Sequence, residues 1–170
     1  MAWRMYSGLT ESAALTIASH GNDVIKRTYL PKMIAGDWSG TMCLTEAHSG
    51  TDLGILKTRA EPQADGSYAI TGTKIFISAG EHDLTQNIVH LVLARLPDAP
   101  AGTRGISLFV VPKFRPDANG DAGERNGVVC GSIEHKMGIH ASPTCVMHLN
   151  DSIGWLLGKP NEGLACMFTM

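Results

Sequence analysis

The hydrophobic period of the chain changes near residue 38, and this change restricts the fold more than any other feature of the sequence. Before it, apolar residues recur every three to four positions, which is the period of a helix with one buried face. After it, short apolar runs alternate with glycine-rich turns, which is typical of β-strands. The sequence therefore predicts helices, then a β region, then the start of another helix.

Two short helices are predicted in the first part of the chain. Thr10 is expected to cap a helix over 11–20, because a threonine side chain can accept a hydrogen bond from the first helical turn. Asn22 is expected to cap a second helix in the same way. Pro31 should interrupt this helix and Gly36 should end the turn that follows, because proline lacks an N–H and glycine tolerates a left-handed conformation.

The β region is predicted to contain many short strands. Asp65-Gly66 is a strong hairpin signal between extended segments, and Gly72-Thr73 indicates a second tight turn. The predicted strands cover residues 40–45, 55–61, 67–71, 74–78, 87–96, 105–112, 128–134 and 144–149. This pattern favours a mainly β fold, an antiparallel β-barrel or sandwich.

The order of these elements predicts a division into three pieces. Residues 1–37 are expected to end a helical domain, and residues 38–150 to form a β-barrel domain. Residues 151–170 are expected to contain a linker and the start of a second helical domain, which is truncated. We therefore expect the chain to be a piece of a longer protein.

Charge and cysteine spacing argue against several classes of function. The 14 basic and 16 acidic residues leave a formal net charge of -2, which gives no electrostatic reason to expect nucleic acid as a partner. No apolar run approaches the roughly 20 residues of a transmembrane helix. The four cysteines have no Cys-x-x-Cys spacing and the histidines have no ligand spacing, so no metal site is predicted. Without a signal peptide, we expect a cytoplasmic protein with reduced thiols.

Several motifs in a fixed order resemble the acyl-CoA dehydrogenase family. The segment MCLTEAHSGTD at 42–52 is similar to the signature of that family, and KIFISAG at 74–80 is similar to its second flavin strand. Further similar motifs, in family order, are His20-Gly21, YLPK at 29–32, GISLFVVP at 105–112, KMG at 136–138 and the glycines Gly158 and Gly163. The run IEHKMG at 133–138 resembles most the bacterial long-chain or methylmercaptopropionyl-CoA dehydrogenase-like members.

This resemblance implies an FAD-dependent oxidoreductase that introduces an α,β double bond into an acyl-CoA thioester. It also implies electron transfer to an electron-transfer flavoprotein and a homo-oligomer in the full-length protein. The family's catalytic base is a glutamate from the C-terminal helical domain, which is expected beyond Met170. No catalytic residue is therefore predicted in this chain, and neither Glu46 nor Glu134 stands at the position of that base.

The resemblance also selects the residues that would face the cofactor, which we call the candidate flavin surface. Its members are Met42, Leu44, Thr45, Gly50, Thr51, Phe76, Ile77 and Ser78. Reduced flavin carries negative charge near N1 and O2, so donors from Thr45 and a hydroxyl from Ser78 near N5 would stabilise it. Phe76 replaces the tryptophan that usually packs on the flavin, and Thr51 is also expected to contact acyl-CoA.

Taken singly, each of these residues is typical of an ordinary strand or turn, so the flavin assignment depends on the order of the motifs. Two alternatives remain open at the level of sequence. One is a flavoprotein of the same fold from the DNA-associated alkylation-defence group, for which a long basic C-terminal extension would be the sign. The other is a β-barrel binding module without catalytic activity.

Overall fold

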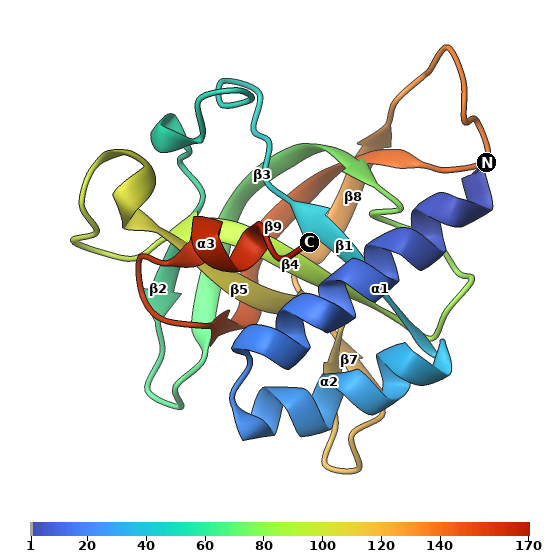
Figure 1. The fold of residues 1–170 in the computed structure, drawn as a ribbon, viewed down its shortest axis with the longest axis horizontal. Coiled ribbons are helices and arrows are strands. Elements are labelled where there is room, and N and C mark those ends of the chain that lie inside the picture. Colours follow the sequence, from blue (N-terminus) through green and yellow to red (C-terminus); the bar gives the residue numbers. More distant parts are fainter. Residues whose placement is uncertain (1) are drawn as a thin grey trace.

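The computed structural model describes residues 2–170, which form two helices, a β-barrel and a short third helix (Figure 1). The helices are α1 (Ala2–His20), α2 (Asp23–Ala35) and α3 (Gly163–Met167), and two 3₁₀ turns are η1 (Leu53–Ile55) and η2 (Gly102–Gly105). The strands are β1 (Trp38–Cys43), β2 (Arg59–Pro62), β3 (Tyr68–Ser78), β4 (Asn87–Arg95), β5 (Ile106–Pro112), β6 (Phe114–Pro116), β7 (Ala122–Arg125), β8 (Val128–Ile133) and β9 (Thr144–Leu157). The predicted mainly β fold is therefore confirmed.

Helix α1 begins well before the predicted cap at Thr10, so that prediction is wrong. The Thr10 hydroxyl donates to the Tyr6 carbonyl at 2.7 Å, one helical turn earlier. The same hydroxyl oxygen accepts a hydrogen bond of 3.1 Å from the Gly40 N–H of strand β1. Thr10 therefore connects α1 to the sheet instead of starting the helix.

Helix α2 has the predicted caps but is not interrupted by Pro31. The Asn22 side chain accepts from the Ile25 N–H at 2.9 Å, and Gly36 has the left-handed φ of 83° that ends the helix. The buried residues Ile25, Tyr29 and Met33 follow one another at four-residue spacing. Their packing into the core holds one continuous helix across the proline, which explains why the predicted interruption is absent.

Five strands close into a ring in the order β4, β2, β3, β9, β5, with β5 pairing again with β4. Strand β8 lies on β9, and β6 and β7 form a separate hairpin. Most pairs are antiparallel as predicted, but β1 runs parallel to β4, and β2 meets β4 in parallel at Arg59 and Arg95. The sheet is therefore mixed, because hydrophobic alternation along a strand carries no information about the direction of its neighbour.

Strand β3 is continuous through Gly72, where a tight turn was predicted. A Cβ atom on Gly72 would lie 2.3 Å from Thr58 Oγ1, so the glycine allows close approach of a neighbouring segment and not a change of direction. The predicted strand over 55–61 begins only at Arg59, because η1 occupies 53–55. The predicted hairpin at Asp65-Gly66 is confirmed by the antiparallel pairing of β2 and β3.

The last strand is longer than predicted. Strand β9 was expected to end at Leu149, but it continues to Leu157 and pairs there with β5. The first residues of the segment 151–170 therefore belong to the sheet, because Ile153 and Gly154 still pair with β3. The division of the chain into domains stays a prediction.

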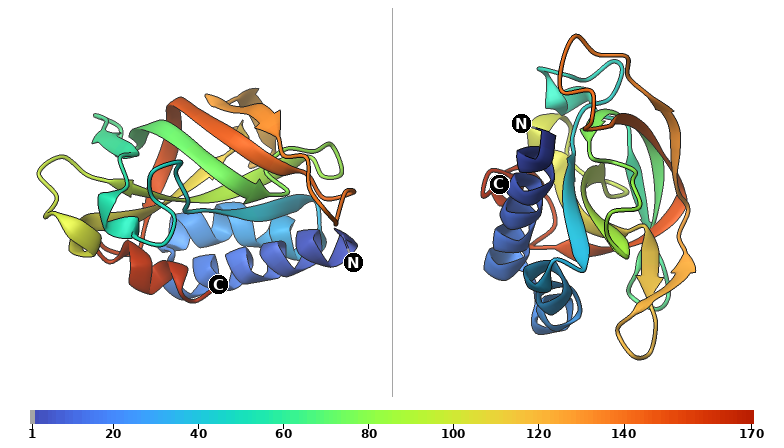
Figure 2. Two further views of the ribbon diagram at one scale, coloured as in Figure 1. Left: turned by 90° about the horizontal axis from the view of Figure 1, so that it is seen from above. Right: turned by 90° about the vertical axis from the view of Figure 1, so that its right-hand side faces the viewer.

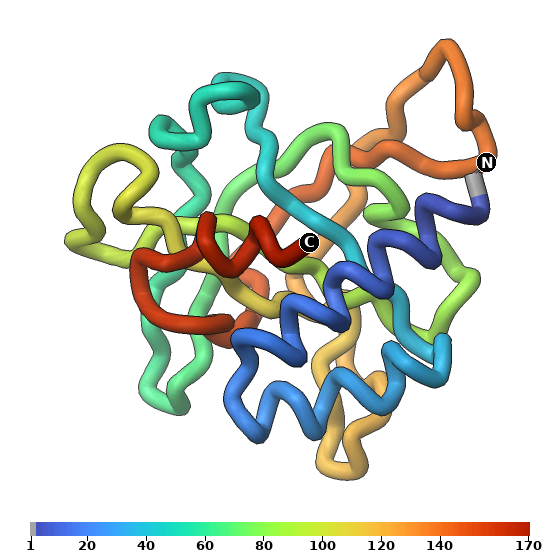
Figure 3. The backbone as a smooth tube through the Cα atoms, in the orientation of Figure 1, coloured from blue at the N-terminus to red at the C-terminus, as the bar shows by residue number. Residues whose placement is uncertain are grey.

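The three helices cover one face of the barrel (Figure 2). One hydrophobic cluster lies between these helices and the sheet and includes Ile17, Trp38 and Leu108. A second cluster, which includes Phe109 and Met147, joins residues of β1 to β5, β8 and β9. The loop 134–143 lies beside the start of α1 (Figure 3), where the Tyr6 hydroxyl donates to the Ala141 carbonyl at 3.2 Å.

In the part of the chain that the structure describes, no helix combines the length and apolar character needed to cross a bilayer. Nor do these residues include a group of three or more His, Cys, Asp or Glu side chains that could hold a metal ion.

Candidate functional site

The first part of the candidate flavin surface follows strand β1. Met42 is 36% exposed, whereas Thr41 and Cys43 on either side of it are buried, so the strand turns Met42 to the outside. Leu44 and Thr45, directly after the strand, are half-buried. Within residues 2–170, neither the Thr45 N–H nor its hydroxyl makes a hydrogen bond. Both groups can therefore donate to a ligand.

A backbone contact joins this segment to the second part of the surface, on β3. The Ile75 N–H donates to the Thr45 carbonyl at 2.8 Å, so Thr45 lies beside the residue that precedes Phe76. Sequence order separates the two segments, but the structure brings them together. Ser78 is half-buried at the end of β3, and no hydrogen bond of its hydroxyl occurs among the described residues.

A β-bulge turns the Phe76 ring outward. The bulge lies between Lys74 and Ile77 in the pairing of β3 with β9. Phe76 has a left-handed φ of 60° and its side chain is 58% exposed, whereas Ile77 is buried in the core. A left-handed conformation is unfavourable for a bulky L-residue, and such strain is concentrated at functional sites. The ring face is therefore available to pack on a flat ligand.

The third part of the surface is a tight turn that exposes Gly50 and Thr51. Glu46 and Ser49 exchange backbone hydrogen bonds of 2.9 and 3.0 Å, and the Ser49 hydroxyl donates to the Asp52 carbonyl at 2.8 Å. The N–H groups of Gly50 and Thr51 have no hydrogen-bond acceptor among residues 2–170. An exposed turn with free N–H groups can bind an anion such as a phosphate.

Sequence reasoning missed a buried ion pair directly behind this surface. Lys74 Nζ lies 2.9 Å from Glu46 Oε1, and the two side chains are 0% and 4% exposed. Burial alone raises the pKa of Glu46, but the Lys74 ammonium and the donors of Thr58 and Lys57 outweigh it and lower the pKa to about 2. Burial also lowers the pKa of Lys74, and Glu46 opposes that effect. The motif did contain a signal: a charged residue adjoins Thr45, and another precedes Phe76 by two positions.

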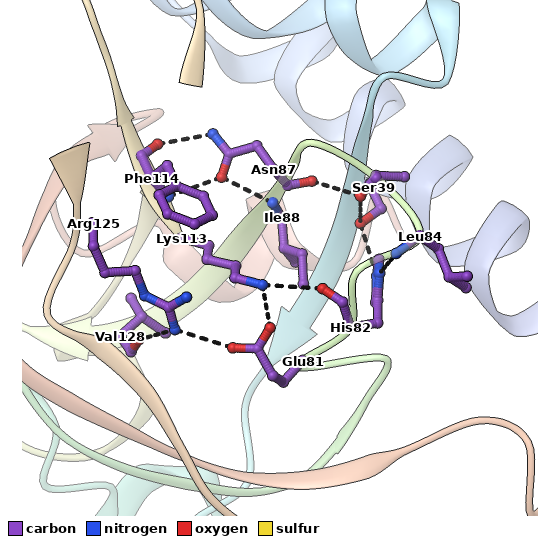
Figure 4. A network of polar contacts seen from close by, with 11 residues as sticks. Ser39, Glu81, His82, Leu84, Asn87, Ile88, Lys113, Phe114, Arg125 and Val128 are labelled. Atoms are coloured by element: carbon purple, nitrogen blue, oxygen red, sulfur yellow. Dashed lines mark hydrogen bonds and ion pairs between the residues drawn. The ribbon is translucent and has the colours of Figure 1, made fainter. Parts of the chain in front are cut away.

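A second polar network fixes the loop that follows β3 (Figure 4). The Glu81 carboxylate accepts hydrogen bonds from Lys113 and from Arg125, the latter at 3.0 Å. Burial raises the pKa of Glu81, but the two cations outweigh it and lower the pKa below its usual range. Lys113 also donates to the His82 carbonyl at 3.0 Å, and His82 Nε2 contacts Ser39 Oγ at 3.1 Å. The end of β3 is thus held on a rigid support.

A cavity of about 520 Å³ lies elsewhere, between α1, the end of α2 and the loop at 82–85. Apolar atoms dominate its lining, which includes Trp38, Met33 and Tyr6. It contains none of the residues of the candidate flavin surface. The exposure of Met42, Gly50, Thr51 and Phe76 leaves that surface open to a flat ligand.

The chain matches the family model described as "Acyl-CoA dehydrogenase, middle domain" over residues 41–152. It is 54% identical to 3-methylmercaptopropionyl-CoA dehydrogenase of Ruegeria pomeroyi, over 95% of this chain and 28% of that protein. It is 42% identical to a butyryl-CoA dehydrogenase of Syntrophomonas wolfei, over 98% of this chain and 29% of that protein. The chain thus spans less than a third of the length of these relatives.

Solved structures show the same architecture. Butyryl-CoA dehydrogenase of Megasphaera elsdenii superposes with a TM-score of 0.76 and 28% identity, over 96% of this chain and 40% of that one. An acyl-CoA dehydrogenase complexed with FAD from Bacillus anthracis gives a TM-score of 0.73 and 29% identity, over 91% and 24% of the two chains. The resemblance drawn from the motifs is confirmed: this chain belongs to the acyl-CoA dehydrogenase family and contains its middle domain.

Proposed function

We propose that the chain forms the flavin-facing part of an FAD-dependent acyl-CoA dehydrogenase. The observation that supports this most directly is the set of free donors, at Thr45, Gly50, Thr51 and Ser78, beside an outward-facing aromatic ring at Phe76. A flavin needs these features, namely donors at the ring edge, a ring face to pack on, and N–H groups near a pyrophosphate. Bound FAD would accept a hydride from the β-carbon of an acyl-CoA thioester.

The residues of this chain would bind and orient the cofactor and the thioester. Thr45 and Ser78 would donate to the edge of the flavin ring, and Phe76 would cover one ring face and exclude water. Met42 and Leu44 would pack against the ring system, and the backbone of Ile77 would face it. Gly50 and Thr51 would contact the pyrophosphate, and Thr51 would also touch acyl-CoA.

The catalytic base is proposed to come from another part of the full-length protein. Glu46 is a poor candidate because Lys57 N, Thr58 N, Thr58 Oγ1 and Lys74 Nζ all donate to its carboxylate. Its pKa of about 2 also lies far below the value at which a carboxylate removes a proton well near neutral pH. The isolated chain is therefore expected to lack dehydrogenase activity.

Electron transfer to an electron-transfer flavoprotein and assembly into a homo-oligomer belong to the same proposal. An electron transferring flavoprotein structure from Acidaminococcus fermentans contains a chain that superposes with a TM-score of 0.75 and 31% identity. That match covers 95% of this chain and 40% of the other.

The substitution Thr45→Val in the full-length protein tests the assignment. It removes the hydroxyl but keeps the β-branched shape, so FAD retention or turnover should fall by about tenfold, the effect of one lost hydrogen bond. Thr45→Ser keeps a hydroxyl and serves as the control, which should retain most of the bound FAD. Unchanged cofactor content and rate in Thr45→Val would contradict the proposed contact.

A further inference from the structure

The buried pair of Lys74 and Glu46 lies where two parts of the candidate flavin surface meet. Glu46 directly follows Thr45, and Lys74 precedes Phe76 by two positions on β3. Lys74 Nζ donates to Glu46 Oε1 and to the Leu44 carbonyl, both at 2.9 Å. One ammonium group thus connects β3 to the residues on both sides of Thr45.

Other hydrogen bonds complete this support. Glu46 accepts from Lys57 N at 2.7 Å, from Thr58 N at 3.0 Å and from Thr58 Oγ1 at 2.6 Å. The Thr45 carbonyl accepts from Ile75 N at 2.8 Å. Three consecutive residues, 44–46, are therefore each fixed by a hydrogen bond. The N–H and hydroxyl of the middle one have no hydrogen-bond partner within residues 2–170.

Fold stability does not by itself account for an ion pair at this place. Removing two charges from water costs about as much as their attraction returns, and apolar residues of similar volume often serve a core equally well. The ion pair can instead serve binding by fixing the peptide of Thr45. Donors that are already oriented need no reorganisation when charge develops on a ligand.

We propose that Lys74 and Glu46 are positioning residues that hold the peptide of Thr45 in the orientation that binds the flavin. This inference rests on the proposed function, since it requires FAD at the candidate flavin surface. Lys74 acts through the Leu44 carbonyl, and Glu46 through its own backbone, so neither residue needs to touch the cofactor. The pair thereby adjusts both the affinity for FAD and the reduction potential of the bound flavin.

The double variant Lys74→Met/Glu46→Gln in the full-length protein tests this inference. It removes both charges together, so no unpaired charge is left in the core. The melting temperature should still fall moderately, because the amide nitrogen introduced at position 46 would face a donor and the Leu44 carbonyl loses its donor. The Thr45 peptide loses its anchor, so the dissociation constant for FAD should rise by about tenfold. The potential of bound FAD should become more negative, because reduced flavin loses an oriented donor.

Two further variants separate positioning from stability. Thr58→Val keeps both charges paired and removes only the hydroxyl that donates to Glu46 Oε1, so it should fold and shift the flavin potential in the same direction by less. Lys32→Met is the control, since it breaks another Lys–carboxylate pair, with Asp121, that involves no residue of the candidate flavin surface. The control should leave FAD affinity and potential unchanged.

The outcomes distinguish this inference from the proposed function. If the double variant and Thr58→Val both keep the FAD affinity, the potential and the visible spectrum of the unsubstituted protein, the positioning role is wrong and the flavin site stands. If the unsubstituted full-length protein binds no FAD, the proposed function fails and this inference fails with it. If the double variant does not fold, Thr58→Val alone decides, and an unchanged potential overturns the inference.

Discussion

Phe76 combines an exposed ring with a backbone conformation that its side chain disfavours. A ring that is 58% exposed gains little from burial, so the fold has no evident need for a bulky residue at a φ of 60°. Strain of this kind persists where the surrounding structure fixes it, here the bulge between β3 and β9. We infer that the Phe76 ring serves to contact a ligand and not to stabilise the fold, as the proposed flavin contact would explain.

Substitution of Phe76 should therefore separate stability from binding. Phe76→Gly removes the left-handed penalty, whereas Phe76→Ala keeps it, so the glycine variant should be more stable than the alanine variant by roughly 1 kcal/mol. Urea unfolding of the 170-residue chain measures this difference. Both variants should weaken FAD binding in the full-length protein. Equal stability of the two variants would show that the backbone at this position is not strained.

The buried His90 makes the free energy of unfolding depend on pH. It is fully buried, its Nδ1 lies 2.7 Å from Thr41 Oγ1, and Nε2 has no partner in the described chain. Burial lowers the pKa of His90 from 6.5 to about 3. The unfolded chain therefore binds a proton between these values and the folded chain does not. Its contribution to stability is full above about pH 6.5 and falls by roughly 1.4 kcal/mol per pH unit below it.

The measurement is the free energy of unfolding by urea at pH 7, 6 and 5. His90→Gln should reduce the slope by about the contribution of one proton. An unaltered slope in His90→Gln would mean that another group binds the proton on unfolding.

Single residues were predictable where a motif selected them, and not where their role depends on a distant neighbour. Asn22 and Gly36 were identified as caps because a cap acts within one turn of chain. Lys74 and Glu46 were missed because their partnership joins β3 to the turn that follows β1, and it appears only when these segments are adjacent. The bulge at Phe76 was missed for the same reason, since it is a property of a pair of strands.

At the scale of elements, close contact between α1 and β1 depends on Gly40. A Cβ atom added there would lie 2.5 Å from Ala13 Cβ and 3.1 Å from Met33 Cε. Gly40→Ala should push α1, which contains Ala13, and α2, which contains Met33, away from the sheet. It should destabilise the fold by about 1–3 kcal/mol, the usual range for overpacking. Thermal unfolding of the 170-residue chain, followed by circular dichroism, checks this.

Gly8, which lies in α1, offers a control for Gly40→Ala. A Cβ atom at Gly8 would meet nothing within 4 Å, so Gly8→Ala should stabilise α1 by up to about 1 kcal/mol through helix propensity. If the two alanine variants had similar melting temperatures, the contact between α1 and β1 would have room for an added methyl group.

Element types were predicted well, but element boundaries were not. Glycine was one source of error, because it marks turns and also sites of close approach. Gly72 was taken for a turn although it accommodates Thr58, and β9 was expected to end at Leu149 although it continues to Leu157. Strand direction was equally inaccessible, since β1 pairs in parallel with β4 across a long stretch of intervening chain.

At the scale of the whole molecule, the candidate flavin surface is an open face. A cofactor bound there would be covered on one side only, and binding must offset the loss of translational and rotational freedom. The isolated 170-residue chain should therefore bind FAD with a dissociation constant above about 1 μM. Fluorescence titration of FAD with the chain measures it. Sub-micromolar affinity would show that this face alone holds the cofactor.

The position of β9 in the ring also has a consequence for synthesis. Strand β9 is the last strand within residues 2–170, and it pairs with β3, β5 and β8. Translation delivers those three strands first, so each has an unpaired edge until the ribosome has released residue 157. Open strand edges promote association between chains, and β8 pairs with no other strand of this sheet. The nascent chain is therefore most exposed to aggregation in the interval before β9 emerges, and it is then that a chaperone would have most to protect.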